Sequence, residues 1–367
     1  VTTLIAALVL GLKGSGTVKG FAQTLALGIV LSMFTALVIT RMILKALYAV
    51  GLKDEKFYGK AKDRKTVDFL AKKKIFFTIS LVMIIGGFVC MGVNKGTSGT
   101  ALNYSLDFVG GTSTNVTFNE DMDLAALDSQ VVPVIEKITK DANVQVQKVA
   151  GGNQVIFKTR TLDVEERQAL TEALVENFGV NSDLITAETI SSTISSEMRS
   201  DAIVAVVIAA ICMLLYIWFR FKDIRFATSS VAALIHDVLV VLAFYAVARV
   251  SVGSTFIACM LTIVGYSINA TIVIFDRIRE NLGAMTKKDD LEQLVNRSIS
   301  QTLSRSIFTS LTTFFMVAAL FVLGVSSIRE FALPLMVGIV CGTYSSVCIT
   351  GALWYVLRTK IGTKKNK

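Results

Sequence analysis

Several ionisable side chains lie inside otherwise apolar stretches of the chain. His236 and Asp237 occur in ALIHDVLVV, and Arg305 begins the apolar part of QTLSRSIFTSLTT. A charge within lipid costs about 2.5–3.5 kcal/mol, so such residues usually face a protein interior or water and are functional by default. A carboxyl group removed from water favours its neutral form, which allows it to exchange a proton. We therefore expect Asp237, with His236 nearby, to couple to an ion.

Polar side chains also recur at helical spacing in GYSINATIVIFDRIREN and in the run after Arg305. Side chains three or four residues apart share one helix face, so these stripes can line a hydrated route. They can also simply join helices, at about 0.6 kcal/mol per hydrogen bond, and we favour that explanation for the threonines and serines. The candidates beside Asp237 are Asn269 and Arg305 for ion coupling, and Thr262, Tyr266, Thr309 and Thr312 for the polar pathway.

Composition indicates an integral membrane protein, because 53% of the residues are hydrophobic and only 18% are charged. A spanning helix needs about 20 largely apolar residues. Seven runs qualify, and residues 1–12 resemble the end of another span. The runs cover residues 20–47, 75–93, 201–219, 226–249, 253–275, 304–324 and 329–357.

The basic residues predict the orientation of these spans. Residues 51–74 carry nine lysines and arginines, which by the positive-inside rule places them in the cytoplasm. Alternation then puts the basic tail 358–367 inside and the polar segment 94–200 outside the cell membrane. The net charge of +9 is thus explained by loops that flank spans, and no nucleic-acid partner is expected.

Two regions between the spans have their own predicted structure. Apolar residues share one face of a helix over 291–299, which either lies on the membrane surface or connects spans beneath the bundle. The segment from Ala101 reads strand, helix, strand, strand, helix, strand, beginning with a strand over 104–118, which is the order of a ferredoxin-like domain. The fold class is an α-helical polytopic bundle with an α+β extracytoplasmic domain.

No enzyme motif is present. The chain has one histidine, no phosphate-binding loop and no metal-ligand spacing among its five cysteines, so we expect no catalytic residue, metal or cofactor.

The two ends of the chain repeat each other. Residues 2–40 align with 312–350 without a gap, and twelve of the thirty-nine positions are identical. VKGFA and IREFA occupy the same place between spans. Duplicated halves are typical of transporters whose site lies at the repeat interface.

The run DFVGGT places a glycine pair at a strand, where unusual backbone shapes are needed. Together with GYSINATIVIFDRIREN, ALIHDVLVV and QTLSRSIFTSLTT, it resembles the SecD/SecF protein-export membrane family, of the resistance-nodulation-division superfamily. The resemblance to SecF covers residue 70 to the C-terminus, and the front of the chain looks like the end of SecD. The extracytoplasmic motif consists of Asp107, Phe108, Gly110, Gly111 and Thr112.

This resemblance implies a division of the chain into six parts. Residues 1–50 are the last two spans of a SecD-like half, the first expected to be incomplete, and 51–74 are a cytoplasmic linker. Residues 75–93 are the first SecF-like span, 94–200 the extracytoplasmic domain, 201–357 a five-span bundle, and 358–367 the tail. The implied function is gradient-driven assistance to protein export, with the Sec translocon channel, its associated membrane subunits, the translocating preprotein and the lipid bilayer as partners.

The chain departs from the family pattern at Ala270. Similar proteins have a carboxylate there, proposed to bind the proton, and alanine cannot titrate. Either Asp237 carries the proton, or an acid in a SecD-like half does so; Arg305 matches the family's functional arginine. Other functions stay open: a small-molecule or lipid exporter of the superfamily, or a passive translocon scaffold.

Overall fold

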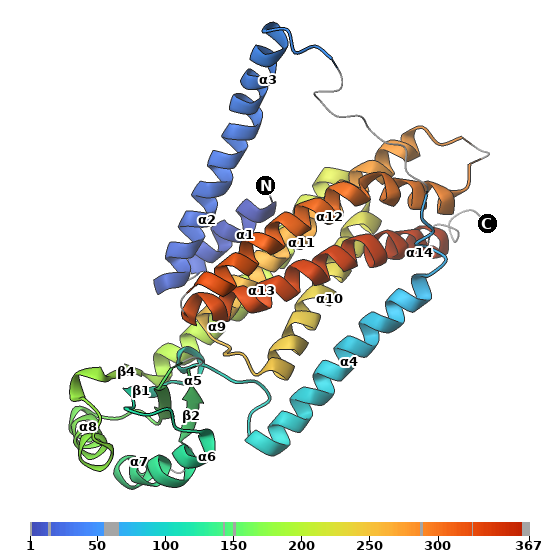
Figure 1. Cartoon of the computed structure of the whole chain (residues 1–367). Coiled ribbons are helices and arrows are strands. Elements are labelled where there is room, and N and C mark those ends of the chain that lie inside the picture. The colour runs from blue at the N-terminus through green and yellow to red at the C-terminus, as the bar shows by residue number, and fades with distance from the viewer. Residues whose placement is uncertain are drawn as a thin grey trace. The chain divides into compact units, whose positions relative to one another are not determined.

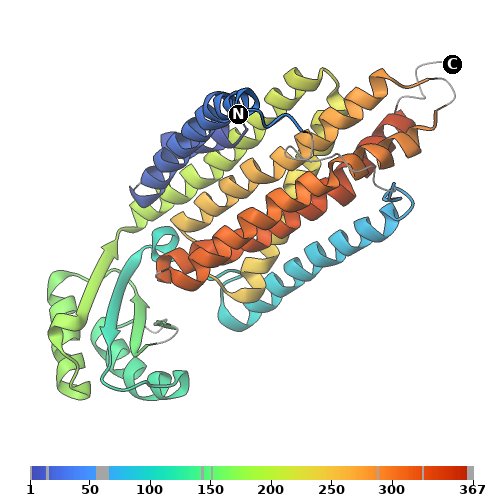
Figure 2. The same ribbon diagram turned by 45° about the horizontal axis from the view of Figure 1, so that its top comes forward.

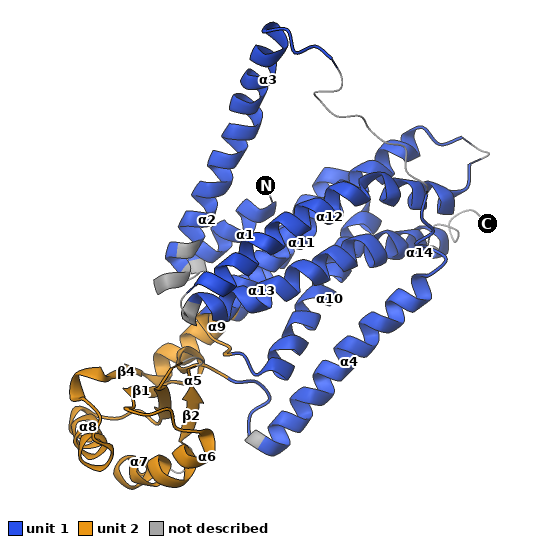
Figure 3. Cartoon of the chain, viewed as in Figure 1, with its two compact units in different colours: residues 1–103, 203–250, 255–367 blue, residues 104–202, 251–254 orange. Residues whose placement is uncertain are grey.

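The structure is a computed structural model that describes residues 2–13, 16–54, 66–141, 144–149, 152–286, 289–324 and 326–361. It comprises two compact units (Figure 3). Residues 1–103, 203–250 and 255–367 belong to a helical unit, and residues 104–202 and 251–254 to a sheet unit. Much of the predicted basic linker, residues 55–65, and of the tail, residues 362–367, lies outside the described residues.

The described residues contain seven helical stretches long and apolar enough to cross a membrane, at the positions predicted from the sequence. An apolar segment in lipid satisfies its backbone polar groups internally by forming a helix. The stretches, with the shorter α1, are α1 (Thr2–Lys13), α2 (Gly16–Phe34) with η1 (Thr35–Ile39) and α3 (Thr40–Ala49), α4 (Lys73–Ser98), α9 (Ser192–Phe221), α10 (Ile224–Ala248), α11 (Ser254–Gly283), α12 (Leu291–Leu323), and α13 (Ser326–Tyr344) with η5 (Ser345–Thr350) and α14 (Gly351–Ile361).

Helix α11 is the central helix of the helical unit. In its most apolar window 67% of the residues are buried, whereas the window within residues 22–49 has none buried. Thr3 and Ala6 of α1 pack on Gly265, where an added Cβ would lie 3.2 Å from either residue. Figures 1 and 2 show α12 and α13 running side by side, and their residues are in contact.

The sequence repeat has a counterpart in the backbone. The π-helical turns η1 and η5 begin at Thr35 and Ser345, positions that the repeat aligns. In each turn a threonine hydroxyl donates to the carbonyl five residues earlier: Thr40 to Thr35 at 3.1 Å and Thr350 to Ser345 at 3.0 Å. The α2–η1–α3 helix is unbroken (Figure 1) and resembles α13–η5–α14 in its detailed winding as well as its composition.

Residues 291–299 are the first part of α12 and not a separate surface helix. Leu294, Val295 and Ile299 are buried in a core that includes Trp354. The Asn296 side-chain oxygen accepts hydrogen bonds from the backbone of residues 69 and 70, at 3.0 and 3.1 Å. This segment therefore connects and packs against the bundle, which is the second of the two interpretations left open by the sequence.

The sheet unit has the predicted order of strands and helices. Its four antiparallel strands are arranged β2-β3-β1-β4, the strand order of a ferredoxin-like sandwich. The bounds are β1 (Gly111–Thr117), α6 (Leu124–Ala126), η3 (Leu127–Val131), α7 (Val132–Thr139), β2 (Gln145–Lys148), β3 (Gln154–Thr159), α8 (Val164–Phe178), η4 (Ser182–Leu184) and β4 (Ile185–Ile190).

The core of the sheet unit lies between one face of the sheet and its helices. Val116 of β1 and Phe157 of β3 point to that face and are fully buried with Leu127, Ile135 and Leu174. The alternation of buried and partly exposed residues along β1 and β3 follows from the two-residue repeat of a strand.

One predicted element of this unit is wrong. Residues 104–118 were expected to form one strand, yet α5 (Leu106–Val109) precedes β1. Gly110 has φ +80° and Gly111 has φ +117°, so the chain turns sharply between them. Alternating apolar residues suggested a longer strand, but the glycine pair ends the pairing at Gly111.

We expect Gly111→Ala to destabilise the sheet unit by at least about 2 kcal/mol, because φ +117° strains an L-residue. A Cβ at residue 111 would also lie 2.3 Å from the Thr159 carbonyl oxygen. The free energy of unfolding of the detergent-solubilised chain measures this loss. Gly152→Ala is the matched control, since a Cβ there meets nothing closer than 4.0 Å. Equal free energies of unfolding for the two variants would show that the backbone at Gly111 does not need a glycine.

Candidate ion-binding site

Asp237 is fully buried in the helical unit and accepts hydrogen bonds on both carboxylate oxygens. The Ser267 hydroxyl donates to Oδ2 at 2.5 Å and the Ser345 hydroxyl at 2.8 Å. On the other oxygen, Oδ1, His236 Nδ1 lies at 2.9 Å and the Cys341 thiol donates at 3.3 Å. A carboxylate has about four acceptor positions, and the four contacts are divided equally between its two oxygens.

The partners of Asp237 come from several helical segments. Ser267 lies on α11, Cys341 on α13 and Ser345 at the start of η5. A Cβ on Gly342 would lie 3.0 Å from the Ser267 Cβ, so the glycine permits the close approach of α11 and α13. Small residues at helix contacts have this role in membrane bundles.

A second layer of hydroxyl groups extends the network. Thr271 Oγ1 and Ser346 Oγ lie 3.0 Å apart, and Ser346 donates to the Ser267 carbonyl oxygen at 3.3 Å. The Ser345 hydroxyl is also 3.2 Å from the Gly342 carbonyl oxygen, a second acceptor within reach. The Ser345 hydroxyl therefore has two acceptors within reach, Asp237 Oδ2 and the Gly342 carbonyl oxygen.

The distances around Asp237 in this structure are those of hydrogen bonds. The ligand atoms of His236, Asp237 and Cys341 lie within 4.8 Å of one another and are all buried. Two ligands of a tetrahedral zinc ion, each about 2.0 Å from the metal, are about 3.3 Å apart. The His236 Nδ1 and Asp237 Oδ1 atoms, at 2.9 Å, are closer than that and at the distance of a hydrogen bond.

Asp237, His236 and the polar stretch that contains Ser267 could be singled out from the sequence, but the pairing of Ser267 with Asp237 and the roles of Cys341 and Ser345 could not. Ser267, Cys341 and Ser345 are small side chains in apolar spans, where helix contact is the ordinary explanation. The available signal was the pair Ser345–Ser346 within one span, although only the packing shows which face it occupies.

The other predicted ion-coupling residues do not reach Asp237 in the part of the chain that the structure describes. Arg305 and Asn269 are exposed, and no ion pair or hydrogen bond joins either to Asp237. Their roles stay predictions. Position 270 is half-buried on α11, next to the exposed Asn269.

The polar-pathway candidates mostly bond within their own helices. The Thr309 and Thr312 hydroxyls donate to carbonyl oxygens one turn earlier on α12, and Thr262 does the same on α11 at 2.6 Å. The Tyr266 hydroxyl oxygen is buried without a hydrogen-bond partner among the described residues. Asp276 pairs with Arg220 at 3.0 Å and with Arg279 at 3.2 Å, as a residue at the end of a span does.

The extracytoplasmic motif holds the beginning of a long helix within the sheet unit. Asp107 Oδ2 accepts from both the backbone N–H of Ser254, at 3.0 Å, and its hydroxyl, at 2.7 Å. Ser254 is the first residue of α11, so Asp107 satisfies a backbone donor that a helix start leaves free. Gly253 makes this possible, because a Cβ there would lie 2.0 Å from the Ser105 hydroxyl.

The same motif contacts the first turns of α9. The Ser195 hydroxyl donates to the Leu106 carbonyl oxygen at 3.3 Å, and Arg199 donates to the Phe108 carbonyl oxygen at 2.8 Å. A Cβ on Gly110 would lie 3.1 Å from the Ser192 Cα. The predicted motif is thus a structural junction between the sheet and the starts of α9 and α11.

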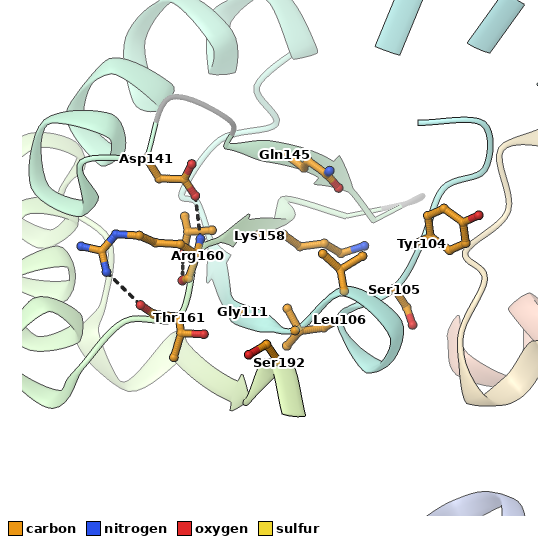
Figure 4. Close-up of a pocket in the computed structure, with 13 residues that line it drawn as sticks. Tyr104, Ser105, Leu106, Gly111, Asp141, Gln145, Lys158, Arg160, Thr161 and Ser192 are labelled. Atoms are coloured by element: carbon orange, nitrogen blue, oxygen red, sulfur yellow. Dashed lines mark hydrogen bonds between the residues drawn. The ribbon is translucent and has the colours of Figure 1, made fainter. Parts of the chain in front are cut away.

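Thr112 completes the motif inside the sheet unit. Its hydroxyl accepts from the Leu162 backbone N–H at 2.9 Å and lies 3.0 Å from the Thr189 hydroxyl, which ties β1 to β4. An adjoining cavity has a volume of about 360 Å³. Its lining includes Leu106, Gly111 of the motif, and Lys158 and Arg160 at the end of β3 (Figure 4).

The apolar spans around a buried carboxylate and the separate α+β unit define a multi-pass membrane protein. A family model described as protein export membrane protein SecD/SecF, C-terminal, matches residues 170–360. The protein translocase subunit SecF of Sebaldella termitidis is 37% identical over 286 residues, covering 78% of this chain and 90% of that protein. The chain belongs to the SecD/SecF family.

Fused relatives match nearly the whole chain. The protein translocase subunit SecDF of Bacillus subtilis is 33% identical over 378 residues, covering 96% of this chain and 49% of the relative. The crystal structure of SecDF from Thermus thermophilus, titled a translocon-associated membrane protein, has a TM-score of 0.83 at 32% identity, covering 98% of this chain and 47% of that one. The chain therefore spans about half the length of these SecDF relatives, consistent with the end of SecD fused to SecF.

We expect Asp107→Ala to loosen the first turn of α11 by about 1 kcal/mol, the usual cost of losing a helix cap. Amide hydrogen exchange at residues 254–257 then accelerates about fivefold, since 1 kcal/mol corresponds to that ratio. Asp128→Ala, an exposed aspartate elsewhere in the sheet unit, is the control and leaves this exchange unchanged. If the effects of Asp107→Ala and Ser254→Ala on this exchange were simply additive in the double variant, a direct hydrogen bond between the two side chains would be contradicted.

Proposed function

We propose that the chain is part of an accessory component of the Sec protein-export machinery that uses an ion gradient, and that Asp237 binds the ion. The observation that carries this proposal is the burial of Asp237 at 0% exposure among four hydrogen-bonding partners. An ionisable group inside a membrane bundle is retained against a cost in stability, so it usually serves ion movement.

The free energy released when one ion crosses the membrane potential is large enough to drive a conformational change. One charge crossing 100 mV gains about 2.3 kcal/mol, which biases a two-state motion by more than tenfold. Protonation of Asp237 changes which groups donate and which accept at the contact of α10, α11 and η5. Such a change can favour a different packing of these helices, because packed helices adopt discrete arrangements.

Asp237 is favoured over the alternative that the ion binds only in a SecD-like half. Position 270 carries alanine, and Asn269 beside it is exposed, so the family's usual carboxylate position offers no acid in this chain. Asp237 is the carboxylate with a complete set of donors from neighbouring helices among the described membrane spans. Coupling to sodium instead of protons uses the same carboxylate and hydroxyl oxygens.

The proposed partners are the Sec translocon channel, its associated membrane subunits and the preprotein in transit. In the proposed orientation the sheet unit lies outside the cell membrane, and the basic linker and tail lie in the cytoplasm. This orientation is supported by the basic residues that flank α4, Lys72, Lys73 and Lys74.

Asp237→Asn preserves the size of the side chain and removes its titration. We expect gradient-dependent export of a secretory preprotein into inverted membrane vesicles to fall about tenfold or more, to the rate seen after the gradient is collapsed. Asp276→Asn is the matched control, since Asp276 is half-exposed and paired with arginines at the end of α11.

Full gradient-dependent export by the Asp237→Asn variant would exclude Asp237 as the coupling site. Export that ignores the gradient in the unchanged protein would instead favour a passive scaffold. Failure of the protein to co-purify with the translocon channel would favour a small-molecule or lipid exporter.

A further inference from the structure

A cavity of about 450 Å³ lies beside the ion site, within the helical unit. Its walls come from α4, α10, α12 and α13 and are apolar with few exceptions. His236 and Cys341, both partners of Asp237, line it together with Tyr344. Asp237, Ser267 and Ser345 do not line this cavity, and each is at most 1% exposed.

His236 has one ring nitrogen at Asp237 and the other unused. Nδ1 lies 2.9 Å from Asp237 Oδ1, whereas Nε2 is buried without a hydrogen-bond partner among the described residues. The residue is only 8% exposed. A buried polar atom without a partner costs about 1–3 kcal/mol, so its retention at a cavity wall calls for a ligand.

Tyr344, which also lines the cavity, is hydrogen-bonded to α4. The Tyr344 hydroxyl donates to the Phe76 carbonyl oxygen at 2.8 Å and lies 3.4 Å from the Ser80 hydroxyl. Phe76 is in the first turn of α4, two residues after Lys74. The centroids of the His236 and Tyr344 rings are 6.2 Å apart, and both residues line the cavity.

We infer that His236 is the port through which a proton passes between this cavity and Asp237, an inference that rests on the proposed function of Asp237. Water in the cavity gives a proton to Nε2, and the ring then releases its Nδ1 proton to Asp237 Oδ1. Asp237 becomes neutral and His236 is left neutral with its proton on Nε2. Release runs the same steps in reverse: Asp237 returns its proton to Nδ1, and Nε2 gives its proton to water in the cavity, which restores the first tautomer.

Cys341 is the other partner of Asp237 at the cavity wall, but its chemistry suits this role less well. A thiol is a weak donor and a weak acceptor, and it must lose a proton before it can take one. A neutral imidazole has an N–H on one ring nitrogen and a free lone pair on the other, so it can take up a proton at one and release a proton from the other. Among the groups that touch both Asp237 and the cavity, His236 alone combines these properties in the described residues.

Proton exchange on Asp237 can be followed by infrared spectroscopy of the chain in lipid vesicles. The carbonyl stretch of its protonated carboxyl group appears after an acid jump and is assigned by its loss in Asp237→Asn. We expect His236→Gln, which retains size and polarity, to slow the appearance of this band by roughly a hundredfold, the usual contribution of a positioned proton-transfer group. His236→Ala gives the same slowing.

Added imidazole distinguishes a proton port from a structural role. In His236→Ala the lost ring leaves space that joins the cavity, so free imidazole enters and restores the rate. In His236→Gln that space stays filled, and imidazole has no effect. If imidazole restores the rate of band appearance in His236→Ala alone, the inference is supported. A molecule that only refilled the space would not transfer protons and would leave this rate slow.

Two results would overturn the inference while Asp237 keeps its role. One is native exchange rates in both His236 variants, and the other is slow exchange in His236→Ala that imidazole leaves unchanged. A carbonyl band that survives in Asp237→Asn would instead refute the proposed function, since Asp237 would not be the group that takes up the proton.

Discussion

A carboxylate far from water needs a complete set of hydrogen-bond donors, and this need organises the helical unit. Asp237 obtains its donors from its neighbour His236 and from α11, α13 and η5. The donors reach it only because Gly342 lets α13 approach α11 closely. The polar site and the apolar packing therefore depend on the same helix contacts.

The π-helical turn at Ser345 is part of this arrangement. Such turns are rare and often occur at functional sites, because the extra residue redirects side chains within a helix. Here the turn starts at the residue that donates to Asp237, and the corresponding turn η1 starts at Thr35. The sequence repeat thus extends to a specific backbone irregularity, which indicates that the two halves share the geometry of this turn and not merely apolar composition.

Helix α11 carries contacts of two kinds. Its first residue, Ser254, is held by Asp107 of the extracytoplasmic motif, and thirteen residues later Ser267 donates to Asp237. Glycines at 110, 111 and 253 permit the close contacts that hold the motif at the starts of α9 and α11.

The sequence by itself determined the spans, the order of strands and helices in the sheet unit, the repeat, and Asp237 as the principal candidate. These features depend on composition and spacing along the chain, which are local. The tertiary structure decided the partners Ser267, Cys341 and Ser345, the exposed positions of Arg305 and Asn269, and the cavity beside His236. Those depend on which faces of distant helices meet, and an apolar helix gives little sign of that, because nearly all its faces are hydrophobic.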